Sequence, residues 1–178
     1  MTSKLFAVLA TVLLTGAALA QNTTPSTSEN STAPVAYLYF SVYEPGHDTV
    51  TPGKARTRIE AYSVKPDGSL STIPGSPFAK DGYTTQMCVN GKYLFATTHL
   101  EQTHLFPGKV NSYKIESDGA LKLSHVLGDA VLTNITLDRT GDTLYGQKYG
   151  FGDLLSYRVR WSDGGLEYLG QVTAVDLG

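Results

Sequence analysis

The chain is poor in residues that could cross-link it or react as a thiol. Among its 178 residues there is a single cysteine, Cys88, so no disulfide can form within one copy, and the fold must be held by packing. Cys88 lies in the strand-like run from Thr84 to Val89. Free cysteine is commonly a small core residue, and no neighbouring residue offers a base. The sequence therefore predicts a buried, inert thiol.

A strong charge of one sign is lacking as well. The 14 lysine and arginine residues are matched by 16 aspartate and glutamate residues, which gives a formal net charge of −2. Nucleic acids and anionic membranes are bound by basic surfaces. The composition thus predicts no nucleic-acid partner and no polybasic membrane surface.

Common catalytic and nucleotide-binding motifs are also missing. The sequence has no Gly-x-Ser-x-Gly elbow, no Cys-x-x-Cys pair, no Gly-Lys-Ser/Thr phosphate loop and no Rossmann fingerprint. The glycine-rich stretch from Gly146 to Gly152 lies among strand-like segments, which argues against a nucleotide loop. Any chemistry is therefore expected from polar side chains in loops.

The first 20 residues have the pattern of a secretory signal peptide. Lys4 precedes an apolar core from Leu5 to Leu14, and small residues around Ala18 suit a signal peptidase. A membrane span needs about 20 apolar residues, so an uncleaved anchor is the weaker alternative. Residues 21–34 are rich in Ser, Thr and Asn, which predicts a flexible linker. We expect an exported protein, periplasmic or secreted, with one folded domain over residues 35–178.

One short pattern occurs three times in this domain. Each copy reads as an alternating strand, an Asp-Gly turn and the start of another strand, the signature of a repeated antiparallel unit. The copies are Ala61-Tyr-Ser-Val-Lys-Pro-Asp-Gly-Ser-Leu70, Ser112-Tyr-Lys-Ile-Glu-Ser-Asp-Gly-Ala-Leu121 and Ser156-Tyr-Arg-Val-Arg-Trp-Ser-Asp-Gly-Gly-Leu166.

A second pattern lies upstream of each copy and completes a four-stranded unit. Its members are Ala36-Tyr-Leu-Tyr39, Lys92-Tyr-Leu-Phe95 and Asp142-Thr-Leu-Tyr145. The second unit is predicted to contain strands from Thr84 to Val89, Tyr93 to Thr98, Val110 to Glu116 and Leu121 to Leu127. The third unit repeats this order from Leu132 to Val172, and the first has three strands, so we expect 11 strands. The fold class predicted is all-β, a partial β-propeller of about three blades.

The spacing between the two patterns shows where the repeats differ. It is 24 positions from Leu38 to Tyr62, 19 from Leu94 to Tyr113 and 13 from Leu144 to Tyr157. Length variation is thus concentrated in the connection between the second and third strands of each unit. Variable loops on a constant scaffold commonly carry binding functions, so ligands are expected on the face that these loops share.

Several of these motifs resemble the blades of a known family. Tyr62-Ser-Val64, Asp67-Gly-Ser-Leu70, Ile73-Pro-Gly-Ser-Pro-Phe78 and Gly91-Lys-Tyr-Leu-Phe95 are similar to repeats of the lactonase-type seven-bladed β-propellers, which include bacterial 6-phosphogluconolactonases and carboxy-muconate cyclases. The resemblance implies a site in the central funnel that opens or forms a lactone. It implies a small lactone or sugar derivative as ligand, polar residues at the inner loops, and no obligatory metal or cofactor.

The predicted strands are too few for a ring of that family. Seven four-stranded blades need about 28 strands, and propellers typically contain 4–8 blades. Either the chain is a truncated reading frame or other chains complete the ring. An open stack exposes the apolar faces of its terminal sheets, so we expect marginal stability as a monomer and self-association through exposed blade faces.

Three groups of polar residues in the predicted variable loops are candidates for chemistry. Glu44 and His47 could act as base and proton shuttle in opening a lactone, although an ordinary polar turn at Pro45-Gly46 is the simpler interpretation. His99 and Glu101, with His104, could serve the same reaction or hold a metal, although the spacing is not that of a helical metal motif. Solvated loop histidines are the simpler interpretation of that second group.

The third group is Lys148 with Tyr149. Lys148 could bind the phosphate or carboxylate of a sugar lactone, and Tyr149 could stack on the sugar ring. The simpler interpretation is an aromatic loop packed over the neighbouring blade. Two functions remain open: a lactonase-like hydrolase, and a non-catalytic propeller fragment that serves as a binding or assembly module outside the cytoplasm.

Overall fold

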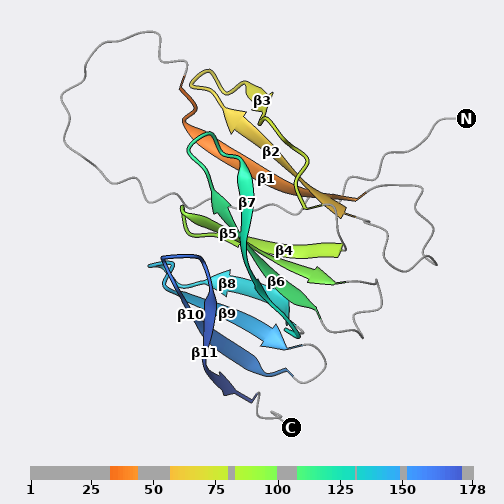
Figure 1. The fold of residues 1–178 in the computed structure, drawn as a ribbon, viewed down its shortest axis with the longest axis vertical. Coiled ribbons are helices and arrows are strands. Elements are labelled where there is room, and N and C mark those ends of the chain that lie inside the picture. The colour runs from red at the N-terminus through yellow and green to blue at the C-terminus, as the bar shows by residue number, and fades with distance from the viewer. Residues whose placement is uncertain are drawn as a thin grey trace, which may run out of the picture.

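Three antiparallel sheets form the described part of the molecule (Figure 1). The computed structural model describes residues 33–43, 57–79, 83–99, 108–130, 132–148 and 152–173. The first sheet contains β1 (Ala36–Tyr43), β2 (Thr57–Val64) and β3 (Leu70–Thr72); the central sheet contains β4 (Tyr83–Val89), β5 (Tyr93–His99), β6 (Lys109–Ile115) and β7 (Leu121–Leu127); the third sheet contains β8 (Leu132–Leu137), β9 (Thr143–Lys148), β10 (Leu154–Val159) and β11 (Leu166–Val172).

The strands follow one another in space as they do in sequence. Each sheet is a simple meander, ordered β1-β2-β3, β4-β5-β6-β7 and β8-β9-β10-β11, with antiparallel neighbours throughout. These 11 described strands confirm the predicted all-β architecture of a partial β-propeller. None of the described segments forms a helix with the length and hydropathy needed to cross a bilayer.

Tight turns join the strands at one edge of every sheet, which we call the turn edge. Glycines with φ between +74° and +87° occupy these turns, namely Gly68, Gly91, Gly119, Gly141 and Gly164. A residue with a Cβ adopts this conformation only with strain, which explains the repeated glycine. The preceding aspartate closes the turn in all three Asp-Gly repeats: Asp67 Oδ1 accepts from Ser69 N (2.9 Å), Asp118 Oδ1 from Ala120 N (3.0 Å) and Asp163 Oδ1 from Gly165 N (2.9 Å).

The longer connections meet at the opposite edge, which we call the loop edge. The antiparallel order places there the ends of β1, β5 and β9 and the starts of β2, β6 and β10. The first strands of the central and third sheets, β4 and β8, also begin at this edge. The topology thus brings the three connections of variable length to one side of the stack, as the spacing predicts.

The sheets stack face to face, with the central sheet between the other two (Figure 1). Side chains of β5 alternate between the two cores: Leu94 and Ala96 pack toward the first sheet, whereas Tyr93 and Phe95 pack toward the third. Every residue of β5 is buried, because a strand with a sheet on both sides has no solvent-facing side. This strand is therefore the centre of the hydrophobic structure.

Tyrosines of one sheet dock on a hairpin of the following sheet at the turn edge. The hydroxyl of Tyr39 donates to the Gly119 carbonyl oxygen at 2.8 Å, and that of Tyr37 donates to the Ser117 carbonyl oxygen at 2.7 Å. Burial raises the pKa of Tyr39, so its hydroxyl remains a donor over the physiological range.

The same docking recurs between the central and third sheets. The Tyr93 hydroxyl donates to the Trp161 carbonyl oxygen at 3.2 Å. A Cβ at Gly164 would lie 2.7 Å from Tyr93 Cδ1, just as one at Gly119 would lie 2.5 Å from Tyr37 Cδ1. Each pair of adjacent sheets is therefore joined by an aromatic ring lying on a hairpin glycine.

The Pro-Gly-Ser-Pro-Phe run folds back along β2. Phe78 and Ile59 exchange both backbone hydrogen bonds (2.7 and 2.8 Å), and Ser76 Oγ accepts from Ala61 N at 3.0 Å. The run thus extends the antiparallel pairing along β2 beyond the short strand β3. This motif thus completes the outer side of the first sheet and satisfies backbone groups that would otherwise need water.

Cys88 should react slowly with thiol reagents in the folded protein. Its half-buried side chain packs against the core between the central and third sheets, and burial raises the pKa of the thiol to about 12. Reaction requires the thiolate, so an aromatic disulfide reagent near pH 8 should label Cys88 only as fast as the protein unfolds. The predicted full burial is only partly met, since Cys88 is half-buried. Urea-unfolded protein is the control, and rapid labelling under native conditions would contradict the packing of the thiol against this core.

Candidate functional site

Buried polar side chains gather at the loop edge. Of the seven buried polar or charged residues that the structure describes, all except Ser112 lie there: Thr57, Thr84, Thr97, Thr98, His99 and Asp153. Hydrogen bonds satisfy several of them, since Thr57 Oγ1 accepts from Thr84 N (2.6 Å) and Thr98 Oγ1 accepts from Asn111 Nδ2 (3.1 Å). Buried polar groups are costly and need partners, so this concentration separates the loop edge from the apolar cores.

The first strands of the central and third sheets, β4 and β8, pair irregularly at the same edge. The pairing of β4 with β5 shifts between Thr84 and Met87, and that of β8 with β9 shifts between Leu132 and Asn134. Bulges of this kind redirect side chains and are common beside functional sites. Their recurrence at equivalent places in two sheets makes the loop edge a repeated feature of the scaffold.

His99 is the last residue of β5, where it pairs with Tyr83. The expectation that it lies in a variable loop as a solvated histidine is wrong, because its side chain is buried. Alternation along β5 from Phe95 places His99 on the side facing the third sheet. The strand extends one residue beyond its predicted end, and this carries the imidazole into the junction between two sheets.

The His99 ring occupies the space beside Gly108. A Cβ at Gly108 would lie 2.8 Å from His99 Nδ1 and 2.9 Å from the Ala130 carbonyl oxygen. Gly108→Ala should therefore push the imidazole out of place and lower the free energy of unfolding by about 1–3 kcal/mol. Urea denaturation measures this change, and Gly128→Ala is the control, since a Cβ at Gly128 would meet nothing within 4 Å. Equal stabilities for the two variants would contradict the placement of His99.

Lys148 and Asp153 flank the β9–β10 connection. Lys148 is the last residue of β9, and its backbone N–H donates to the Asp153 carbonyl oxygen at 2.8 Å. Alternation from Leu144 places Lys148 on the side of the third sheet that faces the central sheet. Leu155 of β10 is on this side too, and Asp153 lies two residues earlier, just before β10 begins. Asp153 is a buried carboxyl group.

Two of the predicted residues, His99 and Lys148, thus end strands at the loop edge, on the facing sides of the central and third sheets. Asp153 lies opposite Lys148 at the same edge. Sequence reasoning named the segment that contains Asp153 but gave that residue no role. Asp153 follows Lys148 by five positions, across a short connection that sets the two residues opposite each other. This spacing is the signal in the sequence that would have identified Asp153.

The remaining predicted site residues lie outside the described residues. These are Glu44, His47, Glu101 and Tyr149. Within the described part of the chain, no three His, Cys, Asp or Glu side chains are grouped closely enough to hold a metal ion.

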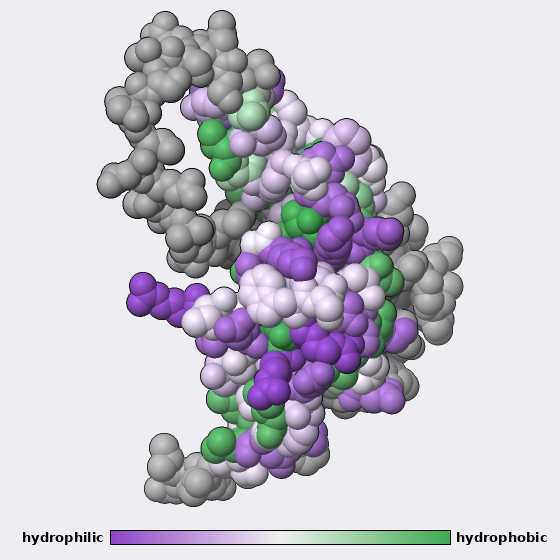
Figure 2. All heavy atoms as spheres, turned by 60° about the vertical axis from the view of Figure 1, so that its left-hand side comes forward, coloured by the Kyte–Doolittle hydropathy of each residue, from purple (hydrophilic) through white to green (hydrophobic). Residues whose placement is uncertain are grey.

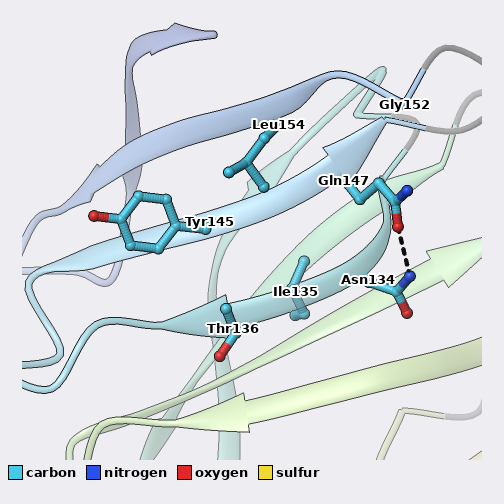
Figure 3. Close-up of a pocket in the computed structure, with 7 residues that line it drawn as sticks. All are labelled: Asn134, Ile135, Thr136, Tyr145, Gln147, Gly152 and Leu154. Carbon is cyan, nitrogen blue, oxygen red and sulfur yellow. Dashed lines mark hydrogen bonds between the residues drawn. The ribbon is translucent and has the colours of Figure 1, made fainter. Parts of the chain in front are cut away.

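A shallow hollow of about 290 Å³ lies on the far side of the third sheet (Figure 3). It is lined by Asn134, Ile135, Thr136, Tyr145, Gln147, Gly152 and Leu154. Asn134 Nδ2 donates to Gln147 Oε1 at 2.8 Å, so the two amides satisfy each other in part. The Tyr145 ring and the Leu154 side chain supply the apolar surface. This hollow is separate from the junction that contains His99, because it lies on the side of the third sheet that points away from the central sheet.

Comparisons with known proteins identify the fold by structure and not by sequence. No family model matches the chain, and no curated protein matches it in sequence. Solved structures do match. A protein from Lactobacillus plantarum has a TM-score of 0.55 and 14% identity, over 79% of this chain and 40% of that one. A protein of unknown function from Desulfotomaculum acetoxidans has a TM-score of 0.52 and 14% identity, over 65% and 35%.

A third solved structure carries a functional name. The "putative 6-phosphogluconolactonase" from Bacteroides uniformis has a TM-score of 0.52 and 18% identity, over 65% of this chain and 34% of that one. The chain therefore spans about a third to two fifths of the solved structures it resembles. At these identities the likeness concerns the fold alone, and it agrees with the meanders and stacking described above: the chain has the fold of a partial β-propeller.

Proposed function

We propose that this chain is an exported, lactonase-like β-propeller unit that binds a small sugar-derived or dicarboxylic lactone at its loop edge and opens it with water. One observation carries the proposal: two buried polar residues, His99 and Asp153, lie with Lys148 at the loop edge of the central and third sheets, where the variable connections are. A base, a cation and a carboxylate in one partly dry site are the groups that lactone opening uses.

The imidazole and the lysine have distinct roles in this reaction. An imidazole takes a proton from water as the water oxygen attacks the lactone carbonyl carbon. The bond from that carbon to the ring oxygen then breaks, and the ring oxygen takes the proton to become a hydroxyl group. We assign the base to His99 and binding of a substrate phosphate or carboxylate to Lys148. Glu44, His47, Glu101 and Tyr149 are further candidates on the connections that lead to this edge.

A panel of neutral and anionic lactones, followed by acid release at constant pH, tests the proposal. His99→Gln should lower kcat about 10²- to 10⁴-fold, the range typical of general-base loss. Lys148→Met should raise KM for anionic lactones and leave neutral lactones unchanged. His125→Gln and Lys122→Met, both on β7, are the matched controls. If the wild-type protein opens no lactone faster than buffer does, catalysis is refuted.

A second function, ligand binding without catalysis, is favoured by a specific observation. The His99 side chain is buried, and a general base must contact the water that it activates. Lactones or sugar acids that raise the melting temperature of the wild type but not of Lys148→Met, without being hydrolysed, would support this binding function over the enzymatic one.

A further inference from the structure

Two sheet faces have no neighbouring sheet among the described residues. The rear face is the side of the first sheet that points away from the central sheet, and it carries Leu38, Phe40, Tyr62 and Leu70. The front face is the opposite end of the stack, on the third sheet, and it carries Tyr145 and the hollow. Between these ends, the side in Figure 2 is mainly hydrophilic, with hydrophobic residues in small separate groups.

The rear face exposes Leu70, whose equivalents in the other two repeats are buried. Leu121 and Leu166 follow the Asp-Gly turns of the central and third sheets and are 8% and 7% exposed, whereas the equivalent Leu70 is 53% exposed. The difference is not in the sequence motif, which is the same in all three repeats. It arises because the central and third sheets each have a preceding sheet that covers this leucine.

The hairpin glycines show the same difference between the first sheet and the other two. Gly119 and Gly164 are covered by the rings of Tyr37 and Tyr93, but nothing lies within 4 Å of a Cβ placed on Gly68. Gly68 has the same left-handed conformation, with φ of +81°. The first sheet therefore presents a docking hairpin of the kind that is occupied at both internal junctions.

The front face presents part of the partner for such a hairpin: Thr143 stands where Tyr37 and Tyr93 cover the glycine at the internal junctions, but the neighbouring aromatic position is kept. Tyr145 occupies the position of Tyr39 and Phe95 in the repeat, and both of those rings are buried against the following sheet. Tyr39 also donates its hydroxyl hydrogen to the carbonyl oxygen of a hairpin glycine, Gly119. Tyr145 is the same residue type on an uncovered face and has the hydroxyl that such a bond needs.

The rear and front faces also differ in relief, with a large side chain on one and a hollow on the other. The rear face carries Phe40, paired edge to face with Tyr62, where the repeat has the small residues Ala96 and Gly146. The front face carries a hollow of about 290 Å³. A protruding ring on one end of the stack thus corresponds to a depression on the other, and a buried aromatic side chain contributes substantially to an interface.

We propose that the front face of one copy binds the rear face of a second copy, head to tail, in the arrangement that already joins the sheets within the chain. Tyr145 of one copy then donates to the Gly68 carbonyl oxygen of the other, and Leu70 becomes buried. Because every copy carries both faces, two copies cover each other's faces twice, and their six described sheets form a ring within the 4–8 blades of known propellers. This assembly does not depend on catalysis at the loop edge.

Light scattering after size exclusion tests the assembly on the full chain. We expect a discrete dimer whose mass does not grow further with concentration, because a closed ring leaves no free face. A monomer over the whole accessible concentration range would overturn the proposal, and so would open-ended growth.

Blocking variants test the head-to-tail orientation. Leu70→Arg blocks the rear face and Tyr145→Arg blocks the front face, so each variant alone should be monomeric. An equimolar mixture retains one intact front face and one intact rear face per pair, and it should form a heterodimer. A dimer of either variant alone would indicate like faces in contact and overturn the proposal, as would a mixture that stays monomeric.

Two further variants separate loss of the interface from loss of folding. Tyr145→Phe keeps the ring and removes only the hydroxyl group, so with two such bonds lost per dimer it should weaken dimerisation about ten- to a hundredfold with an unchanged circular dichroism spectrum. Leu123→Arg is the control, because Leu123 is 52% exposed on β7, away from both faces. Equal dimerisation of Tyr145→Phe and the wild type, or loss of the dimer in Leu123→Arg, would contradict the assignment.

Discussion

Phe95→Ala should lower the free energy of unfolding by about 3–5 kcal/mol, the range for truncating a buried phenylalanine. The ring is fully buried in the core between the central and third sheets, and the neighbouring strands are held in register on both sides of β5. The surrounding side chains therefore have little freedom to fill the cavity. A loss of this size is a large share of the stability of an ordinary domain.

Urea denaturation monitored by circular dichroism measures the effect of Phe95→Ala. Leu123→Ala is the matched control, because it removes an apolar side chain from an exposed site on β7 and should change the stability by no more than about 0.5 kcal/mol. If Phe95→Ala cost less than about 1 kcal/mol, β5 would not be the strand on which both cores depend.

Gly119→Ala should be much more destabilising than the equivalent substitution Gly68→Ala. Both glycines have positive φ, +85° and +81°, so each alanine variant carries a backbone strain of about 1–2 kcal/mol. At Gly119 the new Cβ would also lie 2.5 Å from Tyr37 Cδ1 and 2.7 Å from Ile73 Cδ1. Overpacking of this kind adds about 1–3 kcal/mol, so the difference between the variants isolates the contact between sheets.

The Gly119 and Gly68 variants should be compared at a dilution where light scattering shows only monomer. Under that condition the Gly68 hairpin has no partner, and its variant reports backbone strain alone. Indistinguishable unfolding midpoints would mean that the tyrosines do not join the sheets by lying on the hairpin glycines.

The repeats made the fold predictable to a large extent. The Asp-Gly and Asn-Gly turns fixed where the strands reverse, because few other residues tolerate the left-handed turn position. Alternation on either side of these turns then gave strands close to the observed ones; β7 spans Leu121–Leu127 as predicted, and β5 gained one residue. Local turn chemistry and a period of two residues were sufficient because the sheets are meanders of sequential neighbours.

The environment of each repeat could not be predicted in this way. Leu70, Leu121 and Leu166 occupy the same motif position, yet their burial depends on whether another sheet lies against them. His99 raises the same difficulty, because its local sequence is polar and resembles a loop. Its burial results from the strand running one residue further beside Gly108, and this depends on tertiary packing.

The candidate site was predicted in part for a similar reason. Lys148 was singled out from its own segment, but its proximity to the junction that contains His99 depends on how the third sheet stacks on the central one. Asp153 was assigned no role, although its burial distinguishes it from the other described aspartates. The resemblance to lactonase-type propellers agrees with the fold, whereas the residues that perform any reaction depend on the site.

The position of the central sheet between two others also affects how the molecule fluctuates. The outer sheets each have one neighbouring sheet, so either can detach locally at a lower cost than global unfolding. Amide hydrogens of β5 should then exchange with solvent more slowly than those of β1 or β10. Partial opening of the third sheet would admit water to His99 and Asp153 while the other core stays intact. Access to the buried polar junction would in that case be set by a local breathing motion of one sheet.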